Sequence, residues 1–428
     1  MNDLRGKRLL FLGAIRALCE PINVAKQMGI YTIALDYLPD SPAKKVADKA
    51  YLVSTTDIDA VVDVCKKEKV DGLFTAFTDS MLPYARKICD RLGLPFYASE
   101  EQIRLSLDKR FFKDVCRKNG VDVPNDYTQG INELGLENVE ISFPVIVKPV
   151  DSSGGRGIRV CTSLEELKSA YEYALQVSPG KNVLVEEYIV GDEVTATYTM
   201  KNGEISLSCL KDKLVSHDHE NITSQSDILI MPSRHIKRYM DTTNERVVQM
   251  LKHIEATDGT VFLQGIATEK RIVFFECGYR INGACDYRHI ERENGINYMK
   301  MMIAHAVCGE MSGYELSMDN PFFSKYILTF NMWAHGGKIG HMSGCDEVLK
   351  LDNVSFAEYM HDVNDVLVDN NTLSQRVFRA IIIDSDVEKI KETVKAIQKT
   401  VVINNEHGEN MLYSNFNIER LNGYGKEC

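Results

Sequence analysis

The order of apolar and polar positions changes along the chain and divides it into three parts. In the first part, short apolar runs alternate with amphipathic segments. Strands are predicted over residues 8–13, 31–36 and 72–77, and helices over 14–28, 57–68 and 80–92. Such alternation is typical of a parallel sheet that is covered by helices on both faces. We therefore predict a doubly wound parallel α/β domain over residues 1–107.

The second part, residues 108–310, has a different order of elements. A strand, a small-residue loop, a strand, a helix and three strands are predicted over residues 143–210. Residues 213–235 are polar and are predicted to form an exposed loop. A helix over 243–256 and a hairpin over 260–277 follow. This order indicates an α+β domain, in which residues 122–190 form a lid.

The third part, residues 311–428, gives a weaker signal. Strands are predicted over 326–334 and 377–383, a helix over 387–397, a hairpin over 401–412, and a glycine-containing loop over 340–344. We predict that this part is a smaller α+β domain packed against the second.

The small-residue loop lies between the predicted strands at 143–147 and 158–160. Glycine and serine let backbone N–H groups approach an anion closely, and Lys148 adds a positive charge just before the loop. The residues expected to meet a phosphate are Ser152, Ser153, Gly154, Gly155 and Gly157. The GxxxxGK[ST] and GxGxxG patterns are missing. Two interpretations therefore stand, a flap over a polyphosphate and an ordinary glycine-rich hairpin.

Three other features also have two interpretations each. Lys109 lies in the first turn of a predicted helix, where the helix dipole disfavours a cation, so it either reaches an anion or is solvated. Gly13 and Asp36 end the first two strands, as in dinucleotide-binding folds, but that motif needs three glycines and one is present. His217 and His219 are either ligands or solvated loop residues.

Composition and charge narrow the classes of function. The net charge of −11 disfavours non-specific binding to nucleic acid or to anionic membranes. No run approaches the roughly 20 apolar residues of a membrane span, and the N-terminal segment does not read as a signal peptide. The 11 cysteines are scattered without metal-ligand spacing. This usage is expected of a cytoplasmic protein with reduced thiols.

Four short motifs occur in a fixed order along the chain. They are Asp108-Lys109; Lys148-Pro149 with the loop that ends at Gly157; Glu186-Glu187-Tyr188-Ile189-x-Gly191-x-Glu193; and Phe275-Glu276-x-x-x-Arg280. In this order they resemble the ATP-grasp superfamily, and specifically its carboxylate–amine ligases, such as biotin carboxylase, the purine-pathway ligases and the L-amino-acid ligases. The resemblance implies an α/β and α+β architecture, with a pre-ATP-grasp domain over 1–107, an ATP-grasp domain over 108–310 and a C-terminal domain over 311–428.

The resemblance also implies binding of ATP together with Mg²⁺, or with Mn²⁺ in its place. Lys109 and Lys148 would neutralise the phosphates while the small-residue loop closes over them. Glu187 and Ile189 would present backbone groups to the adenine edge, on a segment that also contains Glu186 and Tyr188. Glu193 would accept hydrogen bonds from the ribose hydroxyls.

The last motif departs from the family pattern at the metal. Glu276 stands where the family has a metal-binding glutamate, but Gln264 replaces an acid and Gly278 replaces an asparagine. Glutamine supplies an oxygen without a charge, and Mg²⁺ prefers charged oxygen ligands. Weaker metal binding, a single ion, or recruitment of Asn282 or Glu269 is therefore expected.

The residues predicted to be catalytic are Arg280, Lys148 and Asn282. An arginine at the position of Arg280 holds the carboxylate or the acyl phosphate in the family, and its planar guanidinium suits two oxygens. The resemblance thus implies a ligase that activates a small carboxylate with ATP and transfers the acyl group to an amine or a thiol, and a homodimer is also expected. The alternative is an ATP-binding protein of the same fold with a weak or regulatory role.

Overall fold

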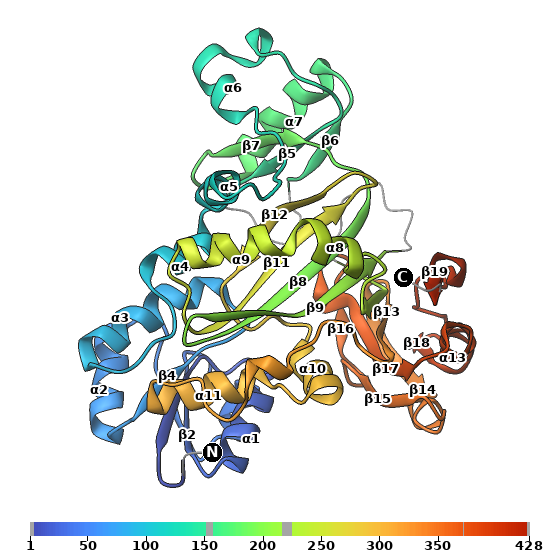
Figure 1. The fold of residues 1–428 in the computed structure, drawn as a ribbon. Coiled ribbons are helices and arrows are strands. Elements are labelled where there is room, and N and C mark those ends of the chain that lie inside the picture. The colour runs from blue at the N-terminus through green and yellow to red at the C-terminus, as the bar shows by residue number, and fades with distance from the viewer. Residues whose placement is uncertain (1–3, 151–156, 216–224, 371, 426–428) are drawn as a thin grey trace.

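A computed structural model of the chain describes residues 4–150, 157–215, 225–370 and 372–425. Figure 1 shows a lobe built from the N-terminal residues, a small lobe at the opposite end, and a broad sheet between them. Within the described residues, no helix combines the length and the apolar character needed to cross a bilayer.

The N-terminal lobe contains a four-stranded parallel sheet with the order β3-β2-β1-β4. Its strands are β1 (Arg8–Leu12), β2 (Tyr31–Asp36), β3 (Lys49–Leu52) and β4 (Gly72–Phe74), and its helices are α1 (Cys19–Gln27), α2 (Ile58–Glu68) and α3 (Leu82–Leu92). Alternate residues of β1 pack in opposite directions, toward α1 on one face and toward α2 and α3 on the other. The predicted doubly wound α/β fold is confirmed.

Two of these helices begin later than the sequence pattern predicted. The chain from Arg16 to Leu18 is a 3₁₀ turn, and α1 begins at Cys19 with Pro21 in its first turn. Likewise α3 begins at Leu82, and Ser80 forms no side-chain cap. Proline has no N–H to donate and is tolerated only in the first turn of a helix, so Pro21 and Pro83 fix where these helices begin.

The small lobe follows two helices that connect it to the rest, α4 (Glu100–Leu107) and α5 (Lys109–Lys118). It contains a three-stranded sheet of order β6-β5-β7, with α6 and α7 beside it. The bounds are α6 (Thr128–Leu134), β5 (Val145–Pro149), β6 (Arg159–Cys161), α7 (Leu164–Val177) and β7 (Val183–Glu187). Residues of β5, β7 and α7 form a hydrophobic core of their own, so this lobe packs as a separate unit.

The central sheet has eight strands in the order β12-β11-β8-β9-β10-β13-β17-β15. The bounds are β8 (Asp192–Lys201), β9 (Glu204–Leu214), β10 (Ile228–Met231), β11 (Gly259–Ala267), β12 (Ile272–Gly278), β13 (Tyr326–Trp333), β15 (Val354–Tyr359) and β17 (Arg376–Asp384). Three of these strands come from beyond residue 310, so one sheet runs across the predicted second and third parts.

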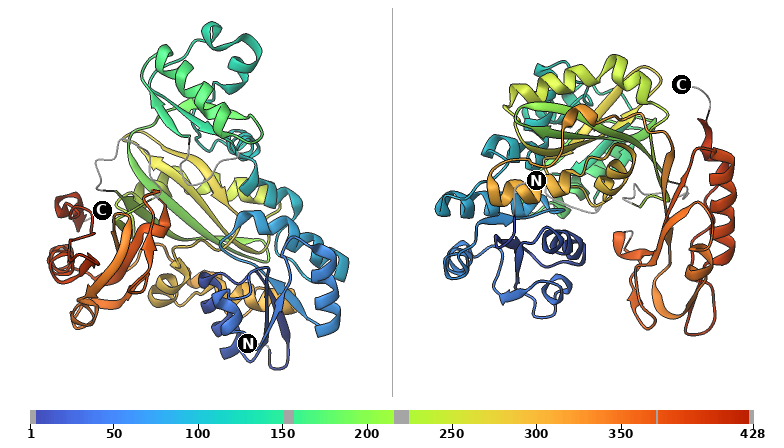
Figure 2. Two further views of the ribbon diagram at one scale, coloured as in Figure 1. Left: turned by 180° about the vertical axis from the view of Figure 1, so that it is seen from behind. Right: turned by 60° about the horizontal axis from the view of Figure 1, so that its bottom comes forward.

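The remaining elements cover this sheet or extend it. They are α8 (Ile236–Thr242), α9 (Asn244–His253), α10 (Asp286–Asn294), α11 (Tyr298–Cys308), α12 (Cys345–Val348), α13 (Val387–Thr400), β14 (Gly337–Ser343), β16 (Val366–Leu367), β18 (Val402–Asn405) and β19 (Asn422–Gly425). Helix α13 packs on β13 and β17, and Figure 2 shows the C-terminal elements beside one end of the sheet. Helix α11 packs against the N-terminal sheet.

Three predicted segments were wrong in detail. The loop predicted over 213–235 contains the end of β9 and all of β10, whose four residues pair with β9 and β13. The loop predicted over 340–344 is mostly strand β14. Helix α10 was missed because its sequence, DYRHIEREN, is mainly polar. Short or polar elements of this kind form because they pair with or pack on neighbouring elements. The local pattern of apolar and polar residues does not show these tertiary contacts.

Gly72 provides a test of the packing between β4 and α11. A Cβ atom at this position would lie 1.9 Å from the backbone oxygen of Ala306. We expect Gly72→Ala to lower the free energy of unfolding by about 2 kcal/mol or more, because overpacking against a backbone cannot be relieved by a side-chain rotation. Urea denaturation measures this change. Gly283→Ala is the control, since its Cβ would meet nothing within 4 Å, and equal stability of both variants would contradict the packing.

Candidate functional site

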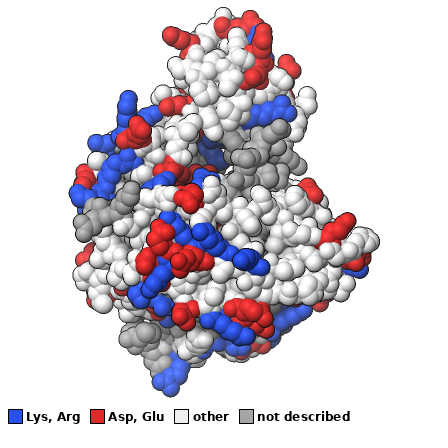
Figure 3. Space-filling view, turned by 90° about the vertical axis from the view of Figure 1, so that its right-hand side faces the viewer, with Lys and Arg blue, Asp and Glu red and all other residues white. Residues whose placement is uncertain are grey.

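The lysines predicted to meet phosphate lie where the small lobe faces the central sheet. Lys109 at the start of α5 places its Nζ 3.9 Å from Oε2 of Glu276 on β12. Lys148 on β5 lies over the ring of Phe275, 5.7 Å from the centroid. The face shown in Figure 3 is hollowed beneath the small lobe, with Lys and Arg atoms at the hollow. Two ammonium groups and one carboxylate thus converge from both sides of the lobe boundary.

Glu186 on β7 forms the electrostatic centre of this boundary. Its side chain is fully buried, and its Oε2 accepts a hydrogen bond from Lys148 Nζ at 3.0 Å. Lys113 on α5, which is also buried, forms an ion pair with the other carboxylate oxygen. Glu186 was predicted to lie on the hinge that faces adenine, and the structure places its carboxylate between two lysines.

The two lysines that share Glu186 have lowered pKa values. Burial, together with the charge of Lys109, lowers the pKa of Lys148 to about 8. Burial and the charge of Lys148 lower the pKa of Lys113 to about 7. One carboxylate cannot fully compensate two buried ammonium groups, so each makes the other easier to deprotonate. An added anion at this place would be met by lysines that can take up protons.

The chain after Glu186 forms the hinge between the lobe and the central sheet. The Glu187 N–H donates to the Asn125 carbonyl at 2.9 Å, but the Asn125 N–H donates to the Glu187 side chain and not back to its carbonyl. The Glu187 carboxylate also accepts a hydrogen bond from Arg271 Nη2 at 2.9 Å, and the Tyr188 N–H donates to the Pro144 carbonyl. These contacts fix the Glu187 side chain and N–H at the end of β7, where the chain passes from the small lobe to the central sheet.

Cross-strand register brings further predicted residues onto one face of the central sheet. Glu276 on β12 stands opposite Gln264 on β11, Gln264 opposite Thr195 on β8, and Thr195 opposite Lys211 on β9. One step along the same face, Glu193 accepts a hydrogen bond from Lys213 at 2.7 Å. The nucleotide residues predicted from separate motifs therefore share one surface.

This surface provides few charged ligands for a metal. Within the described ranges, no three His, Cys, Asp or Glu side chains come together as a metal-binding group. Glu276, whose side chain is 42% exposed, and the amide of Gln264 opposite it supply oxygen ligands. Asn282 is not free to join them, because its Nδ2 donates to Asp286 at 2.7 Å and its Oδ1 accepts from the Ala284 N–H. The donor set fits a single hard cation that also binds phosphate oxygens.

The structure gives a reason for glycine at position 278. A Cβ atom there would lie 2.4 Å from the ring of Phe262 and 3.3 Å from Oδ1 of Asp79. The Phe262 ring in turn lies under the guanidinium of Arg280, with the centroid 5.0 Å away. Phe262 therefore fills the space that a side chain at 278 would need. The Phe262 ring therefore contacts both positions: it excludes a side chain such as asparagine at 278, and it packs against the guanidinium of Arg280.

Arg280 lies between the central sheet and the N-terminal lobe. Its Nη2 donates to Asp79 at 2.5 Å and its Nη1 donates to the Ile281 carbonyl at 3.1 Å. Its neighbour Asp286, at the start of α10, accepts from Lys211 at 2.5 Å as well as from Asn282. These contacts hold the pKa of Asp286 below its usual range although burial opposes this. Asn282 thus contacts Asp286 and the Ala284 N–H in this structure, and its predicted catalytic role stays a prediction.

Part of the predicted phosphate loop lies outside the described residues. This applies to Ser152, Ser153, Gly154 and Gly155, and also to His217 and His219. Gly157 is described: its φ is +84°, and a Cβ atom there would lie 2.6 Å from Pro149 Cγ. Only glycine suits this position.

The alternative dinucleotide site at the end of β2 finds no support in the geometry. The Asp36 carboxylate accepts hydrogen bonds from the backbone N–H groups of Ala14 at 3.0 Å and Leu38 at 2.9 Å. It therefore stabilises the loops that follow β1 and β2. Asp36, the last residue of β2, thus has a structural role in these loops.

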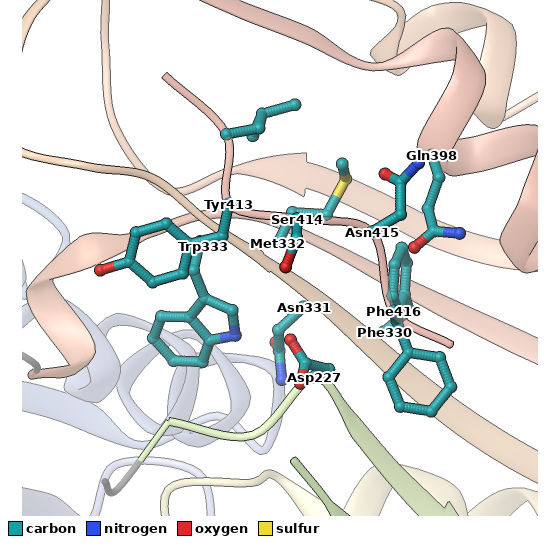
Figure 4. A pocket seen from close by; sticks show the side chains of 11 residues that line it. Asp227, Phe330, Asn331, Met332, Trp333, Gln398, Tyr413, Ser414, Asn415 and Phe416 are labelled. Carbon is teal, nitrogen blue, oxygen red and sulfur yellow. The ribbon is translucent and has the colours of Figure 1, made fainter. Parts of the chain in front are cut away.

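Sequence reasoning missed several polar residues near this site. Lys113 could have been noticed, because it lies on the apolar face of α5 beside Phe112 and Cys116. Asp79, Arg376 and Arg379 gave no signal, because they come from distant parts of the chain. A pocket at the end of β13 was also missed; Figure 4 shows Asp227, Asn331 and Trp333 among the residues that line it.

Comparisons with known proteins agree with this geometry. Residues 108–307 match the family model described as carbamoyl-phosphate synthase L chain, ATP binding domain, and residues 9–91 match the one described as PylC-like, N-terminal domain. The formate-dependent phosphoribosylglycinamide formyltransferase of Prochlorococcus marinus is 26% identical over 208 residues, which are 47% of this chain and 53% of that protein. The chain thus spans about half the length of the curated relatives it matches.

Solved structures resemble the chain over most of its length. Phosphoribosylglycinamide synthetase from Anaerococcus prevotii has a TM-score of 0.74 at 21% identity, covering 93% of this chain and 99% of that one. L-amino acid ligase from Bacillus licheniformis has a TM-score of 0.77 at 15% identity, covering 94% and 99%. A biotin carboxylase domain from Hydrogenobacter thermophilus, in complex with MgADP, has a TM-score of 0.73 at 20% identity, covering 93% and 90%.

The two lobes and the surface between them are those of the ATP-grasp superfamily, which confirms the predicted fold. The match to an ATP-binding domain covers residues 108–307, which are less than half of the chain, so over the whole chain the likeness is one of fold.

The shared carboxylate of Glu186 predicts proton uptake when a nucleotide binds. Because phosphate charge favours protonated lysine, we expect a nonhydrolysable ATP analogue to bind at pH 8 with net uptake of protons, and more weakly as the pH rises above 8. In Lys113→Met the proton uptake should fall. Without the Lys113 ammonium, Lys148 has the Glu186 carboxylate to itself, so it is already protonated before the nucleotide binds. Calorimetry in buffers of different ionisation enthalpy measures this uptake. Lys118→Met, on the exposed side of α5, is the control, and identical uptake in all three proteins would refute the coupling.

Proposed function

We propose that the protein is an ATP-dependent ligase that joins a small carboxylate to an amine through an acyl phosphate. The observation that carries this proposal is the convergence of Lys109, Lys148 and Glu276 at the lobe boundary, on the same sheet surface that leads to Arg280. A cation from the small lobe, a cation from the connecting helix α5 and a carboxylate from the central sheet together suit a nucleotide polyphosphate with its metal.

ATP would bind between the small lobe and the central sheet. Lys109 and Lys148 would contact its phosphates, and the loop that ends at Gly157 would cover them. The Glu187 carbonyl and the Ile189 N–H would meet the adenine edge, and Glu193 would accept from the ribose. Glu186 would act indirectly, by holding Lys148 in place.

Glu276 and Gln264 would hold Mg²⁺, with Mn²⁺ as a substitute. When bound, the ion neutralises charge on the phosphates during transfer. With one carboxylate and one neutral amide, this chain would rely on the nucleotide itself for most of the charge around the ion.

In the first half-reaction, a carboxylate oxygen attacks the γ-phosphorus of ATP, the bond to the β–γ bridging oxygen breaks, and ADP leaves. In the second, an amine nitrogen attacks the carbonyl carbon, phosphate leaves, and the nitrogen gives up a proton. A thiol would react in the same way to give a thioester. Arg280 would hold the carboxylate and then the acyl phosphate, since Asp79 already fixes its guanidinium.

The relatives suggest substrates for a first panel. The curated relatives are named formate-dependent phosphoribosylglycinamide formyltransferases, and two structural relatives are named for phosphoribosylglycinamide and L-amino acids. We therefore include formate, bicarbonate and amino acids as acids, and amino acids and glycinamide derivatives as amines. A homodimer is part of the proposal, and light scattering after gel filtration tests it.

A second candidate function is ATP binding with weak or regulatory turnover. It is favoured by Gln264 and by the ring of Phe262, which fills the place of the asparagine that the family has at position 278.

Release of ADP tests the proposed reaction. With Mg²⁺–ATP and paired pools of acids and amines, we expect ADP release that depends on both pools. Arg280→Gln should reduce the rate at least about 100-fold while nucleotide affinity stays within about twofold, because the arginine contacts the acid and not ATP. Arg292→Gln, an exposed change on α10, is the control. Nucleotide binding without ADP release from any pool would favour the second candidate function.

Restoring an acid at position 264 tests the metal assignment. We expect Gln264→Glu to tighten Mg²⁺ binding in the presence of a nonhydrolysable ATP analogue by about tenfold, or ~1.4 kcal/mol, because a second carboxylate faces the ion. Calorimetric titration of Mg²⁺ measures the affinity, with the exposed Gln27→Glu as control. If both variants matched the original protein, Gln264 would not be a ligand.

A further inference from the structure

Residues 188–191 join the small lobe to the central sheet, and charged side chains hold this segment at both ends. At the first end, Arg271 Nη2 donates to the Glu187 carboxylate at 2.9 Å. At the second end, Arg234 Nη2 donates at 2.6 Å to the carboxylate of Asp192, which is the first residue of β8. The segment proposed to meet adenine therefore lies between two ion pairs.

The two ends are connected to each other through Arg238 on α8. Its Nη1 donates to two backbone carbonyls of the turn 268–271, at 2.7 and 2.9 Å, and this turn ends at Arg271. Its Nη2 lies 3.3 Å from Nδ1 of His235, whose Nε2 lies 2.8 Å from the Asp192 carboxylate. These contacts form one polar network that holds both ends of the segment.

The C-terminal strand β19 joins the same network. The Tyr424 hydroxyl donates to Oδ2 of Asp212 on β9, and this oxygen also accepts the Arg234 backbone N–H at 3.0 Å. The Arg234 guanidinium lies over the Tyr424 ring, 5.5 Å from its centroid. The Gly425 N–H donates to the hydroxyl of Tyr326 on β13 at 3.0 Å. Tyr424 is only 6% exposed, so β19 packs on the central sheet through a buried side chain.

The burial of Asp212 gives the contact with Tyr424 its energetic weight. The Asp212 side chain is fully buried, and burial raises its pKa although hydrogen bonds from the Ser233 and Tyr424 hydroxyls oppose the rise. A buried carboxylate that loses a donor is left poorly compensated, which costs more than one ordinary hydrogen bond. Loss of Tyr424 should therefore loosen the backbone from which the Arg234 side chain reaches Asp192.

The network and the proposed ribose contact lie on opposite faces of the central sheet. Neighbouring residues of a strand point to opposite faces. Asp192 and Asp212 lie on the face of α8, whereas Glu193 and Lys213, which pair at 2.7 Å, lie on the face of the proposed nucleotide site. The start of β8 thus carries one side chain of each. The C-terminal strand can therefore act on nucleotide binding without contacting the nucleotide.

We propose that Tyr424 is a positioning residue for nucleotide binding, which acts through Arg234 and Asp192 to hold residues 188–191 in the conformation that meets the adenine edge. Packing of β19 and binding of the nucleotide then favour each other, since both act on the same segment. This assignment rests on the proposed ligase function, and it adds the C-terminal strand to the parts of the chain that set nucleotide affinity.

Hydrogen–deuterium exchange of the nucleotide-free protein tests the positioning role, because this measurement needs no ligand. Tyr424→Leu removes the hydroxyl and the ring, and Tyr424→Phe removes the hydroxyl alone. Tyr359→Leu is the matched control, since Tyr359 is a partly buried tyrosine beyond residue 310 whose hydroxyl accepts the Cys345 N–H at 3.1 Å. Arg234→Met interrupts the proposed route, alone and combined with Tyr424→Leu.

We expect Tyr424→Leu to speed exchange in peptides covering 187–192 and 268–271 at least about fivefold, and Tyr424→Phe at least about twofold, with no change in Tyr359→Leu. These peptides should already exchange faster in Arg234→Met, and adding Tyr424→Leu should change their rates less than about twofold, because the route is already interrupted. Tyr424→Phe carries the comparison if Tyr424→Leu does not fold.

Three results would overturn the positioning role. They are unchanged exchange at 187–192 in both Tyr424 variants, an equal increase in Tyr359→Leu, and additive effects of Arg234→Met and Tyr424→Leu. The first means that the segment does not depend on Tyr424. The second means that any loss of stability beyond residue 310 has the same effect. The third means that Tyr424 does not act through Arg234.

Calorimetry with a Mg²⁺-bound nonhydrolysable ATP analogue tests the link to the nucleotide. We expect Tyr424→Leu to weaken binding at least about fivefold and Tyr359→Leu to change it less than about twofold, and the bound analogue should slow exchange in the peptide covering 418–425. Faster exchange at 187–192 with unchanged affinity would also overturn the proposal. If the analogue does not bind the original protein, the proposed function is wrong, and exchange at 187–192 alone decides the role of Tyr424.

Discussion

The structure depends on the ion pairs that Glu186 makes with Lys113 and Lys148. The three groups join the middle of α5 to two strands of the small lobe, and they are buried at the point where that lobe meets the rest of the molecule. A carboxylate in this place carries out two tasks. Its negative charge offsets part of the free-energy cost of burying the Lys148 ammonium. Because it is shared with Lys113, it does not offset all of that cost, so a bound phosphate would stabilise the charge of Lys148 further. Fold and proposed chemistry therefore meet in one side chain.

Much of the fold followed from the sequence because its elements have strong local signals. The helix predicted over 57–68 formed as α2, and the hairpin predicted over 260–277 formed as β11 and β12. Elements that depend on distant partners did not give such signals. Strand β10 has four residues in a polar region and exists because β9 and β13 lie on either side of it.

The candidate site divides in the same way. Lys109, Lys148, Glu187, Glu193 and Glu276 lie in short motifs that the sequence shows. In the structure Lys109 lies 3.9 Å from Glu276, and Glu276 stands opposite Gln264 on the central sheet. Asp79 belongs to no motif, because its role comes from a contact with Arg280 across 201 positions in sequence. Gln264 and Gly278 were visible as departures from the pattern, but Phe262, which explains one of them, was not.

The central sheet is continuous from β12 to β15, so it crosses the domain boundary that the sequence predicted near residue 310. Its last three strands, β13, β17 and β15, all come from beyond residue 310. Changes of substrate in proteins of this architecture would therefore be unlikely to come from exchanging a C-terminal module as a whole, since a transplanted piece would have to match hydrogen bonds with β10. Substitution of single residues along β13 and β17 would change the substrate while the hydrogen bonds of the sheet stay intact.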